Sequence, residues 1–148
     1  MIAIVQRVSR ASVAVDGQII AEIGPGLLAL IAITKTDGPD QIAWMARKLT
    51  TLRMFRNGAA HFDLDVQQSG GAILAVSNFT VAAATRQGRR PSFDAAADPQ
   101  TGRQHFDALL ETLRAAGVPT SAGQFGEDMK VELVNDGPVT VIVDSEQK

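Results

Sequence analysis

The sequence contains no cysteine, which excludes disulfides, thiol catalysis and metal sites built on cysteine. It has only two histidines, His61 and His105, and neither has a metal-ligand neighbour at helical or hairpin spacing. We therefore expect no transition-metal site and no cofactor. The lack of cysteine also fits a protein of the reducing cytoplasm.

Long hydrophobic runs are missing as well. The longest, residues 27–33, is far too short to span a bilayer. The first seven residues lack the basic start and the small-residue cleavage site of a signal peptide. We therefore expect a cytoplasmic protein with no membrane partner. The net charge of −2 also excludes a protein that coats a nucleic-acid duplex by bulk electrostatics, so any contact with nucleic acid has to be local.

The composition that remains is that of an ordered globular protein. With 45% hydrophobic and 20% charged residues, the 148-residue chain is expected to fold as one domain, residues 1–148. Asp16-Gly17 separates two alternating segments and indicates a hairpin, because a type I′ turn needs positive φ at both central residues. The predicted strands are residues 2–8, 11–15, 18–23, 27–33, 53–55, 72–76, 129–134 and 139–143, with polar linkers at 57–71.

Two helices are predicted between these strands. Pro39 suits the first position of one helix, and Trp44 on it is either a partly exposed ring or an interface anchor. The second helix has Asp98 as N-cap, Pro99 at its first position and Gly117 as its C-terminal stop. Their expected buried residues are Ile42, Met45, Ala46, Leu49 and Leu52 in the first, and Phe106, Leu109, Leu110 and Leu113 in the second. This pattern predicts an α/β (α+β-like) domain with a largely antiparallel, barrel-like sheet.

The pair Gly137-Pro138 comes directly before the last predicted strand. Proline is tolerated at the first residue of a strand, and glycine adopts backbone angles that are closed to other residues. An X–Pro bond is also the only common site of a cis peptide. The pair is therefore either an ordinary turn or a rigid corner that directs backbone carbonyls outward.

Two further features place polar groups beside apolar strands. Ser77, Asn78 and Thr80 follow strand 72–76, where their side chains either satisfy local backbone groups or line a pocket. No histidine lies near them in sequence, so a hydroxyl nucleophile here has no adjacent base. Arg7 lies in an apolar strand, and it either points outward or binds carbonyls such as those around Gly137-Pro138.

Three arginines, Arg86, Arg89 and Arg90, fall within five residues of a predicted loop. Arginine forks suit phosphate groups, and Gly88 between them allows close approach of the backbone to a ligand. The alternative is a solvated basic loop without a ligand. In either case the cluster is large enough for a few phosphates and too small for a long duplex.

Five segments match a known family in order and relative spacing. They are residues 6–13, 24–28, 77–80, 88–93 and 135–140. Together they resemble the D-aminoacyl-tRNA deacylase family, also called the D-tyrosyl-tRNA deacylase family, over essentially the whole chain. The resemblance implies a metal-free hydrolase that cleaves the ester between a D-amino acid, or glycine, and the 3′ end of tRNA.

The resemblance also implies how the site is assembled. It implies a homodimer in which a cis Gly137-Pro138 pair of one subunit enters the pocket of the other and acts as a chirality gate. Residues 77–80 are expected to line that pocket, and Arg7 is similar to the arginine that supports the Gly-Pro carbonyls. Phe125 and Met129 resemble positions that line the pocket for the terminal adenosine.

The chemistry that the resemblance implies is modest, because an aminoacyl ester is already activated. The enzyme has to orient water and stabilise an oxyanion, for which we expect the backbone N–H groups of Phe79 and Thr80. Thr80 is either the nucleophile or a group that positions the carbonyl while the 2′-hydroxyl of the substrate assists. Since no base lies beside Thr80, the second role is favoured.

Two positions depart from the family pattern. Asn78 stands where glutamine is usual, which shortens the side chain by one methylene, and Gln87 stands where lysine is common. Two other functions also fit the residues: an aminoacyl-tRNA or nucleotide-binding dimer with weak or lost catalysis, and a dimeric small-molecule binding protein without an RNA partner.

Overall fold

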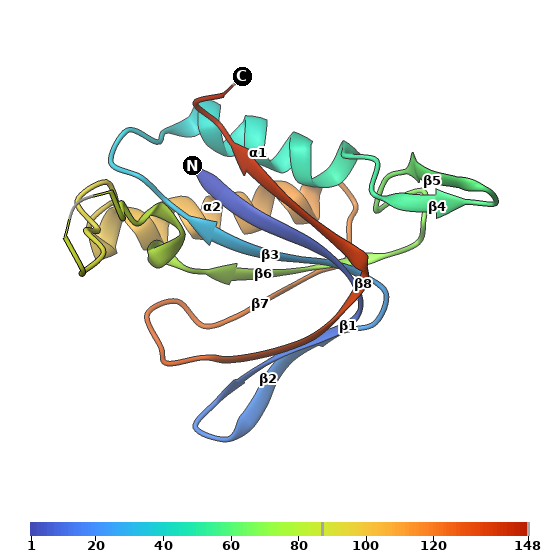
Figure 1. Cartoon of the computed structure of the whole chain (residues 1–148), viewed down its shortest axis with the longest axis horizontal. Helices are drawn as coiled ribbons and strands as arrows, with labels where there is room; N and C mark the ends of the chain where they lie inside the picture. Colours follow the sequence, from blue (N-terminus) through green and yellow to red (C-terminus); the bar gives the residue numbers. More distant parts are fainter. Residues whose placement is uncertain (87, 148) are drawn as a thin grey trace.

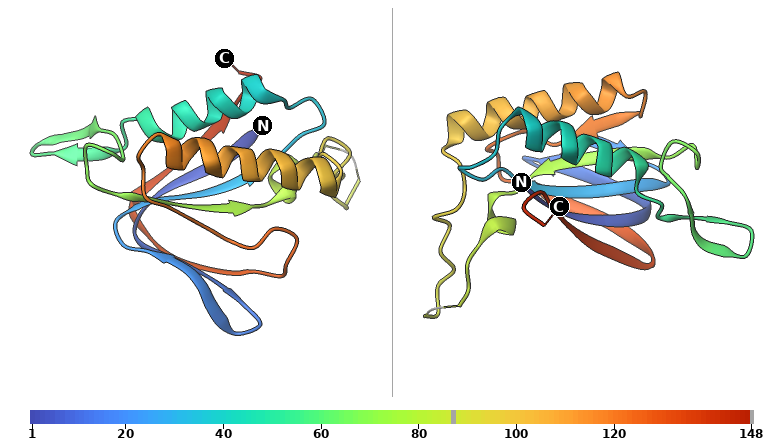
Figure 2. Two further views of the ribbon diagram at one scale, coloured as in Figure 1. Left: turned by 180° about the vertical axis from the view of Figure 1, so that it is seen from behind. Right: turned by 90° about the horizontal axis from the view of Figure 1, so that it is seen from above.

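The fold is a twisted six-stranded sheet with both long helices on one face, and the computed structural model describes residues 1–86 and 88–147 (Figures 1 and 2). The elements in chain order are β1 (Ile2–Val15), β2 (Gln18–Ile23), β3 (Gly26–Ala32), α1 (Pro39–Thr51), β4 (Phe55–Asn57), β5 (Ala60–Leu64), β6 (Ala72–Ser77), the 3₁₀ turn η1 (Phe79–Ala82), α2 (Pro99–Ala115), β7 (Thr120–Ala122) and β8 (Lys130–Asp144). Strands β4 and β5 form a separate hairpin that projects from one end of the molecule.

Strand β1 organises the main sheet. It pairs antiparallel with β2, β3 and β8, whereas β6 pairs parallel with both β3 and β7. The first half of β1 lies between β3 and β8, and its second half lies between β2 and β8. This change of neighbour, together with the twist, curls the sheet toward a barrel (Figure 1). The predicted α+β class with two helices and a largely antiparallel, barrel-like sheet is confirmed.

The two faces of the curled sheet enclose two cores. Side chains alternate along β3, so that Leu27 faces the helices and Leu28 faces the inside of the barrel. The helix side is the larger core and includes Met45, Leu49, Phe106 and Leu113. Strand β3 is thus apolar on both faces, as expected for a strand in the middle of a sheet.

Two pairs of predicted strands are single strands in the structure. Residues 2–8 and 11–15 join in β1, and residues 129–134 and 139–143 join in β8. The β1–β8 register jumps from Gln6↔Thr140 to Val8↔Asn135, so residues 136–139 bulge out of β8 opposite Arg7. The Gly137-Pro138 pair therefore interrupts one long strand. It is not an ordinary turn between two separate strands, which was one of the two alternatives.

Both helices begin where the sequence predicted, and α2 also ends there. Leu52, predicted on the buried face of the first helix, instead follows its last residue, Thr51, and is half-buried. Pro39 and Pro99 are the first residues of α1 and α2, and the helix stop at Gly117 has φ of +83°. The Asp98 carboxylate caps α2 by accepting from the backbone N–H groups of Gln100 and Thr101, both at 3.0 Å. These bonds, chiefly the one from Thr101, lower the pKa of Asp98 below its ordinary value of 3.8.

Several local predictions were wrong. Residues 53 and 54 precede β4, and the predicted linker at 57–71 contains β5, an exposed strand whose mixed composition gives no clear alternation. The three-residue strand β7 and the turn η1 were missed because both are too short for a periodic pattern. His105 on α2 is half-buried, and its Nδ1 has no hydrogen-bond partner among the described residues.

Candidate active site

A cavity of about 530 Å³ opens between the barrel and the amino-terminal half of α2. Its floor is apolar and includes Leu28, Val76 and Leu133. Of the residues predicted for the site, the structure brings five into this cavity: Ser77, Asn78, Phe79, Phe125 and Met129. A volume of this size is typical of a small-molecule site.

Asn78 lines the cavity and is hydrogen-bonded to Thr80, which does not line it. Asn78 is the N-cap of η1, and its Oδ1 accepts from the backbone N–H of Thr80 at 3.2 Å and from the Thr80 hydroxyl. The backbone of Asn78 is fixed in turn, because its N–H donates to the carbonyl of Ile31 at 2.8 Å. The amide holds the Thr80 hydroxyl in place but cannot accept its proton as a base.

The two backbone amides expected at an oxyanion differ in availability. The N–H of Thr80 already donates to the Asn78 side chain. The N–H of Phe79, at the first position of η1, has no acceptor among the described residues. A helix start leaves such N–H groups unpaired, and they attract negative charge. Phe79 therefore offers the better-placed donor for an oxyanion.

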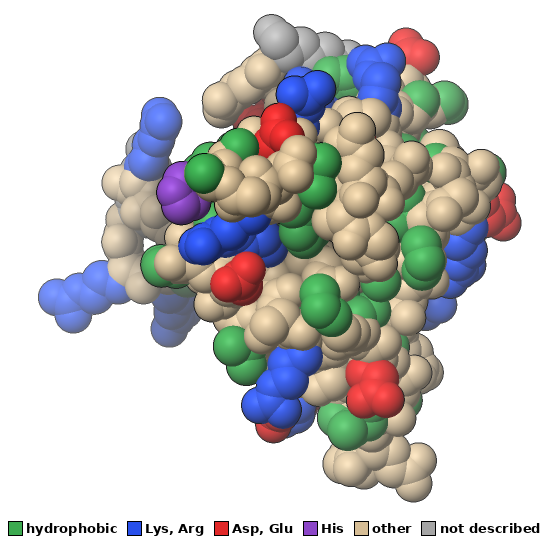
Figure 3. Space-filling view, turned by 90° about the vertical axis from the view of Figure 1, so that its right-hand side faces the viewer, with side chains coloured by type: hydrophobic (Ala, Val, Ile, Leu, Met, Phe, Trp, Pro, Cys, Tyr) green, Lys and Arg blue, Asp and Glu red, His purple; other side chains and the backbone are tan. Residues whose placement is uncertain are grey.

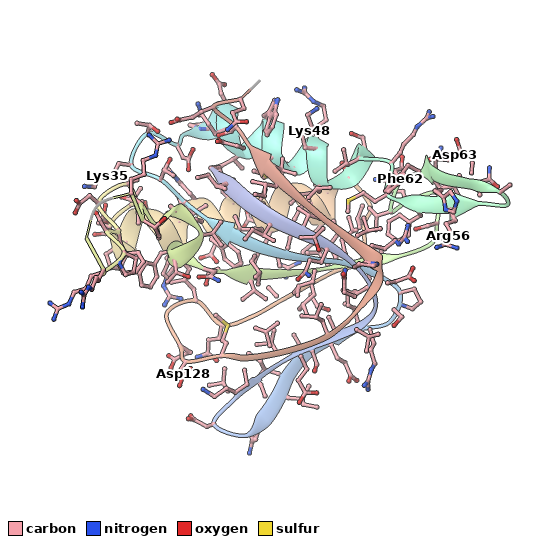
Figure 4. The ribbon with its side chains drawn as sticks, viewed as in Figure 1. Lys35, Lys48, Arg56, Phe62, Asp63 and Asp128 are labelled. Atoms are coloured by element: carbon pink, nitrogen blue, oxygen red, sulfur yellow. The ribbon has the colours of Figure 1, made fainter. Side chains whose placement is uncertain are left out.

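The wall opposite η1 is the segment between β7 and β8, marked by Asp128 in Figure 4. Arg103 of α2 fixes this wall, because its guanidinium lies 4.9 Å from the centre of the Phe125 ring and donates to the Phe125 carbonyl at 2.9 Å. Met129 packs over Gly123, where an added Cβ would lie 2.6 Å from the Met129 sulfur. No pattern in the sequence indicated Arg103, since its contact with Phe125 joins residues that are 22 positions apart.

The Gly-Pro corner, residues 136–139, is held by the buried side chain of Arg7. The Gly137-Pro138 peptide is cis, and Gly137 has φ of +141°, a region that favours glycine. Arg7 donates through Nε to the Asp136 carbonyl at 3.1 Å and through Nη1 to the Met54 carbonyl at 2.6 Å. Its Nε also lies 3.0 Å from the Asp136 carboxylate. Of the two alternatives for Arg7, the structure shows the one with turn carbonyls as partners.

The Gly-Pro corner lies apart from the Asn78–Thr80 turn of its own chain. Arg7 pairs with Leu27 at the start of β3, whereas Ser77 pairs with Ile31 near its end. Four residues of strand separate these positions, which is about 13 Å. Arg7 also binds the carbonyl just before β4, and the β4–β5 hairpin with Arg56 and Phe62 is at the far end of the molecule from Asp128 (Figure 4). Neither Gly137 nor Pro138 lines the cavity of its own chain.

The arginine loop, here residues 84–93 without Gln87, begins where η1 ends. Gln87 lies outside the described residues, so the effect of its departure from the family pattern has no structural account. Arg86, Arg89 and Arg90 are exposed, and in the described ranges no carboxylate lies within 4.0 Å of them. The other end of the molecule, which carries the β4–β5 hairpin, has acidic and basic side chains interspersed (Figure 3), and this fits the small net charge.

Neither histidine supplies a base for Thr80. His61 is exposed on β5, and no described hydrogen bond joins His61 or His105 to the Asn78–Thr80 pair. Within residues 1–86 and 88–147 there is also no group of three or more His, Asp or Glu side chains placed to hold a metal ion. The same ranges contain no helix that is long and apolar enough to cross a membrane.

Comparison with known proteins gives the family. The model of the family described as D-Tyr-tRNA(Tyr) deacylase matches residues 4–144. The chain belongs to this deacylase family. The chain is 50% identical to the D-aminoacyl-tRNA deacylase of Carboxydothermus hydrogenoformans over 97% of this chain and 99% of that protein. It is 47% identical to the enzyme of the same name from Geobacter sulfurreducens over all of this chain and 97% of that protein.

Two solved structures are similar to the deacylase chain. One, the c-Myc DNA unwinding element binding protein, has a TM-score of 0.92, 35% identity and coverage of 97% of this chain and 98% of that one. The other, described as a probable eukaryotic D-amino acid tRNA deacylase, has a TM-score of 0.82 at 14% identity, covers 96% and 97% of the two chains, and so supports the fold alone. Family membership and the hydrolase class, both predicted from the five motifs, are confirmed.

Proposed function

We propose that this deacylase hydrolyses the ester bond of D-aminoacyl-tRNA, and of mischarged glycyl-tRNA, to release the amino acid and tRNA. The observation that carries the proposal is the cavity beside the Asn78–Thr80 turn, where Phe79 lines a largely apolar space and its N–H has no acceptor among the described residues. One deacylase domain, residues 1–148, performs this chiral proofreading of translation in the cytoplasm.

The reaction needs little from the side chains. The terminal adenosine binds against Phe125 and Met129, and the ester carbonyl lies next to the Phe79 N–H, which stabilises the oxyanion that forms when water attacks. Ser77 lines the same space. Thr80 positions the carbonyl while the 2′-hydroxyl of the substrate assists, because Asn78 binds the Thr80 hydroxyl without being able to take its proton.

Chirality is read by the backbone. Because L- and D-aminoacyl groups contain the same atoms, rejection requires a clash or an unpaired polar group. The Gly137-Pro138 carbonyls bind the amino group of the substrate and leave no room for an L side chain. Glycine has no side chain to exclude and therefore passes the gate.

A homodimer brings the gate to the cavity. Since neither Gly137 nor Pro138 lines the cavity of its own chain, the corner of one subunit serves the cavity of its partner. Strand β8, which contains the corner, exposes Ile142 by 74% and Val134 by 43%. Exposed apolar side chains on one strand are suited to a subunit interface.

The substrate is tRNA, and the arginine loop supplies the local cationic contact that binds it. Arg86, Arg89 and Arg90 lie in the loop that follows η1, and none has a carboxylate within 4.0 Å in the described part of the chain. No metal or cofactor takes part in the proposed reaction. The alternative function is a catalytically weak aminoacyl-tRNA or nucleotide-binding dimer. The argument for it is that Asn78, where glutamine is usual in the family, has a side chain that is shorter by one methylene.

A paired hydrolysis assay tests the proposal. D-tyrosyl-tRNA and L-tyrosyl-tRNA are incubated with the protein, and the rates of ester loss are compared with the uncatalysed rates. We expect the D-ester to be cleaved at least about 100-fold faster than the L-ester. Equal rates on both esters would contradict the proposal. Tight, D-selective binding without turnover would instead establish the binding-module alternative.

A further inference from the structure

Two aromatic rings beside the cavity are exposed. The Phe79 side chain is 58% exposed and that of Phe93 is 37% exposed, and their ring centres are 5.1 Å apart with an angle of 75° between the planes. Phenylalanine is usually buried, and an exposed aromatic pair at the mouth of a cavity marks a surface that binds something.

The pair leads outward from the cavity. Phe79 lines the cavity and Phe93 does not, so Phe93 extends the apolar surface beyond the mouth. The position of Phe93 is fixed by the residue before it, because Ser92 and Ala84 form two backbone hydrogen bonds of 2.8 and 2.9 Å. The Ser92 hydroxyl also donates to the Asp94 carboxylate at 2.8 Å. The backbone hydrogen bonds between Ala84 and Ser92 close the loop and hold the Phe93 ring in place.

Cations belong to the same end of the molecule as the pair. The two rings are joined by the loop that contains Arg86, Arg89 and Arg90. Lys35 belongs to the same end of the molecule, since its backbone N–H donates to the carbonyl of Ala95 at 3.0 Å (Figure 4). Among the described residues, no carboxylate lies within 4.0 Å of any of these four cations. A polyanion would supply the missing negative charge.

We propose that the Phe79–Phe93 pair is a stacking platform for the penultimate nucleobase of the tRNA 3′ end. This inference rests on the proposed function, in which the terminal nucleotide occupies the cavity. A single strand that leaves the cavity passes Phe93 first and the arginine loop next, with Lys35 beside it. Aromatic side chains that stack on bases, flanked by cations for the phosphates, are the usual means of holding single-stranded RNA.

A second copy of the chain is the other possible occupant of the rings. It would bring two arginine loops of like charge toward each other if the rings met across a two-fold axis, and such juxtaposition is unfavourable. The unpaired cations therefore favour RNA over a second subunit at this position.

Two short substrates separate stacking from catalysis. D-tyrosyl esters of adenosine and of the trinucleotide CCA are hydrolysed by the wild type and by Phe93→Leu, which keeps an apolar contact with Phe79 but removes the aromatic face. We expect KM for the trinucleotide ester to rise about tenfold in Phe93→Leu with kcat unchanged. The adenosine ester, which lacks the penultimate base, should keep its wild-type KM. Phe93→Trp should restore the trinucleotide KM.

A trinucleotide ester with an abasic sugar at the penultimate position is the matched control, because it removes the stacking base from the substrate and leaves the protein unchanged. With this substrate the wild type and Phe93→Leu should have equal KM. An unchanged trinucleotide KM in Phe93→Leu, an equal rise for both esters, or a change of oligomeric state in sedimentation would overturn the platform. If the wild type hydrolyses neither ester, the proposed function fails by itself, and fluorescence anisotropy with labelled CCA still decides whether Phe93→Leu weakens binding.

Discussion

Arg7 is the residue that links the Gly-Pro corner to the rest of the fold. It is 3% exposed and satisfies two backbone carbonyls, those of Asp136 and Met54. The sequence indicated that a charge inside an apolar strand needs such partners. It did not identify Met54, because that contact joins β1 to the segment just before β4 and depends on where the chain turns after α1.

Replacing Arg7 should destabilise the protein. Arg7→Ala leaves two carbonyls without a donor and opens a cavity, so we expect the free energy of unfolding to fall by about 3 kcal/mol in urea titrations. Asp136→Asn is the control, because that carboxylate is half-exposed and the backbone bond to Arg7 remains; its cost should stay below about 1 kcal/mol. Equal losses in the two variants would contradict this role of the carbonyls.

Thr80 should contribute to the rate without being essential. Asn78 fixes its hydroxyl, and no base lies beside it among the described residues. We expect Thr80→Ala to lower kcat on D-tyrosyl-tRNA about tenfold, the effect of losing one positioning contact. Asn78→Ala, which frees the hydroxyl, should have a similar effect. If Thr80→Ala instead lost all activity above background, Thr80 would be the nucleophile. The sequence did not predict the hydrogen bond between the two residues, because it depends on the short turn η1 that Asn78 caps.

At the scale of elements, the predictable parts are those with local rules. Pro39, Asp98 and Gly117 fixed the helix limits through capping, and Asp16-Gly17 fixed the first hairpin, where both residues have positive φ. Strand β7 was not predictable, because three residues acquire their strand geometry only by pairing with β6. The sequence also did not show that residues 129–134 and 139–143 form one strand, β8. Their continuity depends on β1, which pairs with β8 on both sides of the corner.

The N-cap of α2 should make stability depend on pH. Because the pKa of Asp98 is lower in the folded chain than its ordinary value of 3.8, the ionised carboxylate stabilises the fold. This contribution is complete above pH 3.8 and is lost as the pH falls through the lowered pKa. We expect Asp98→Asn, which keeps a capping oxygen, to be less stable than the wild type at neutral pH and to converge with it in acid.

Urea unfolding from about pH 2 to about pH 7 measures this convergence. Asp107→Asn is the control, because it removes one charge from the exposed side of the same helix and leaves the cap intact. A constant difference between Asp98→Asn and the wild type across the whole range would contradict the assignment.

At the scale of the molecule, the central question is how the Gly-Pro corner, which we propose as the chirality gate, reaches the cavity. The motifs predicted both parts, but only the fold shows that the corner lies apart from the Asn78–Thr80 turn of its own chain, because their distance depends on the register of β1, β3 and β6. We propose that a partner subunit closes this distance. Two variants disable the parts separately: Ser77→Phe fills the cavity, and Gly137→Ala displaces the corner.

The Gly137 variant acts through the backbone. An added Cβ would lie 2.6 Å from the Val139 Cγ2 atom and 2.7 Å from its backbone nitrogen, at a φ that disfavours alanine. The corner has to move, and a misplacement of this size typically costs about 100-fold in rate. Each variant alone should therefore be almost inactive on D-tyrosyl-tRNA while remaining folded.

The most direct test mixes the two variants. Ser77→Phe and Gly137→Ala subunits are unfolded together, refolded in equal amounts and assayed with D- and L-tyrosyl-tRNA. If the gate acts in the partner's cavity, mixed dimers contain one intact site, and D-specific hydrolysis should return to about a quarter of the wild-type rate. If the mixture stays as inactive as the separate variants although mixed dimers have formed, the gate acts within its own chain and the account is contradicted.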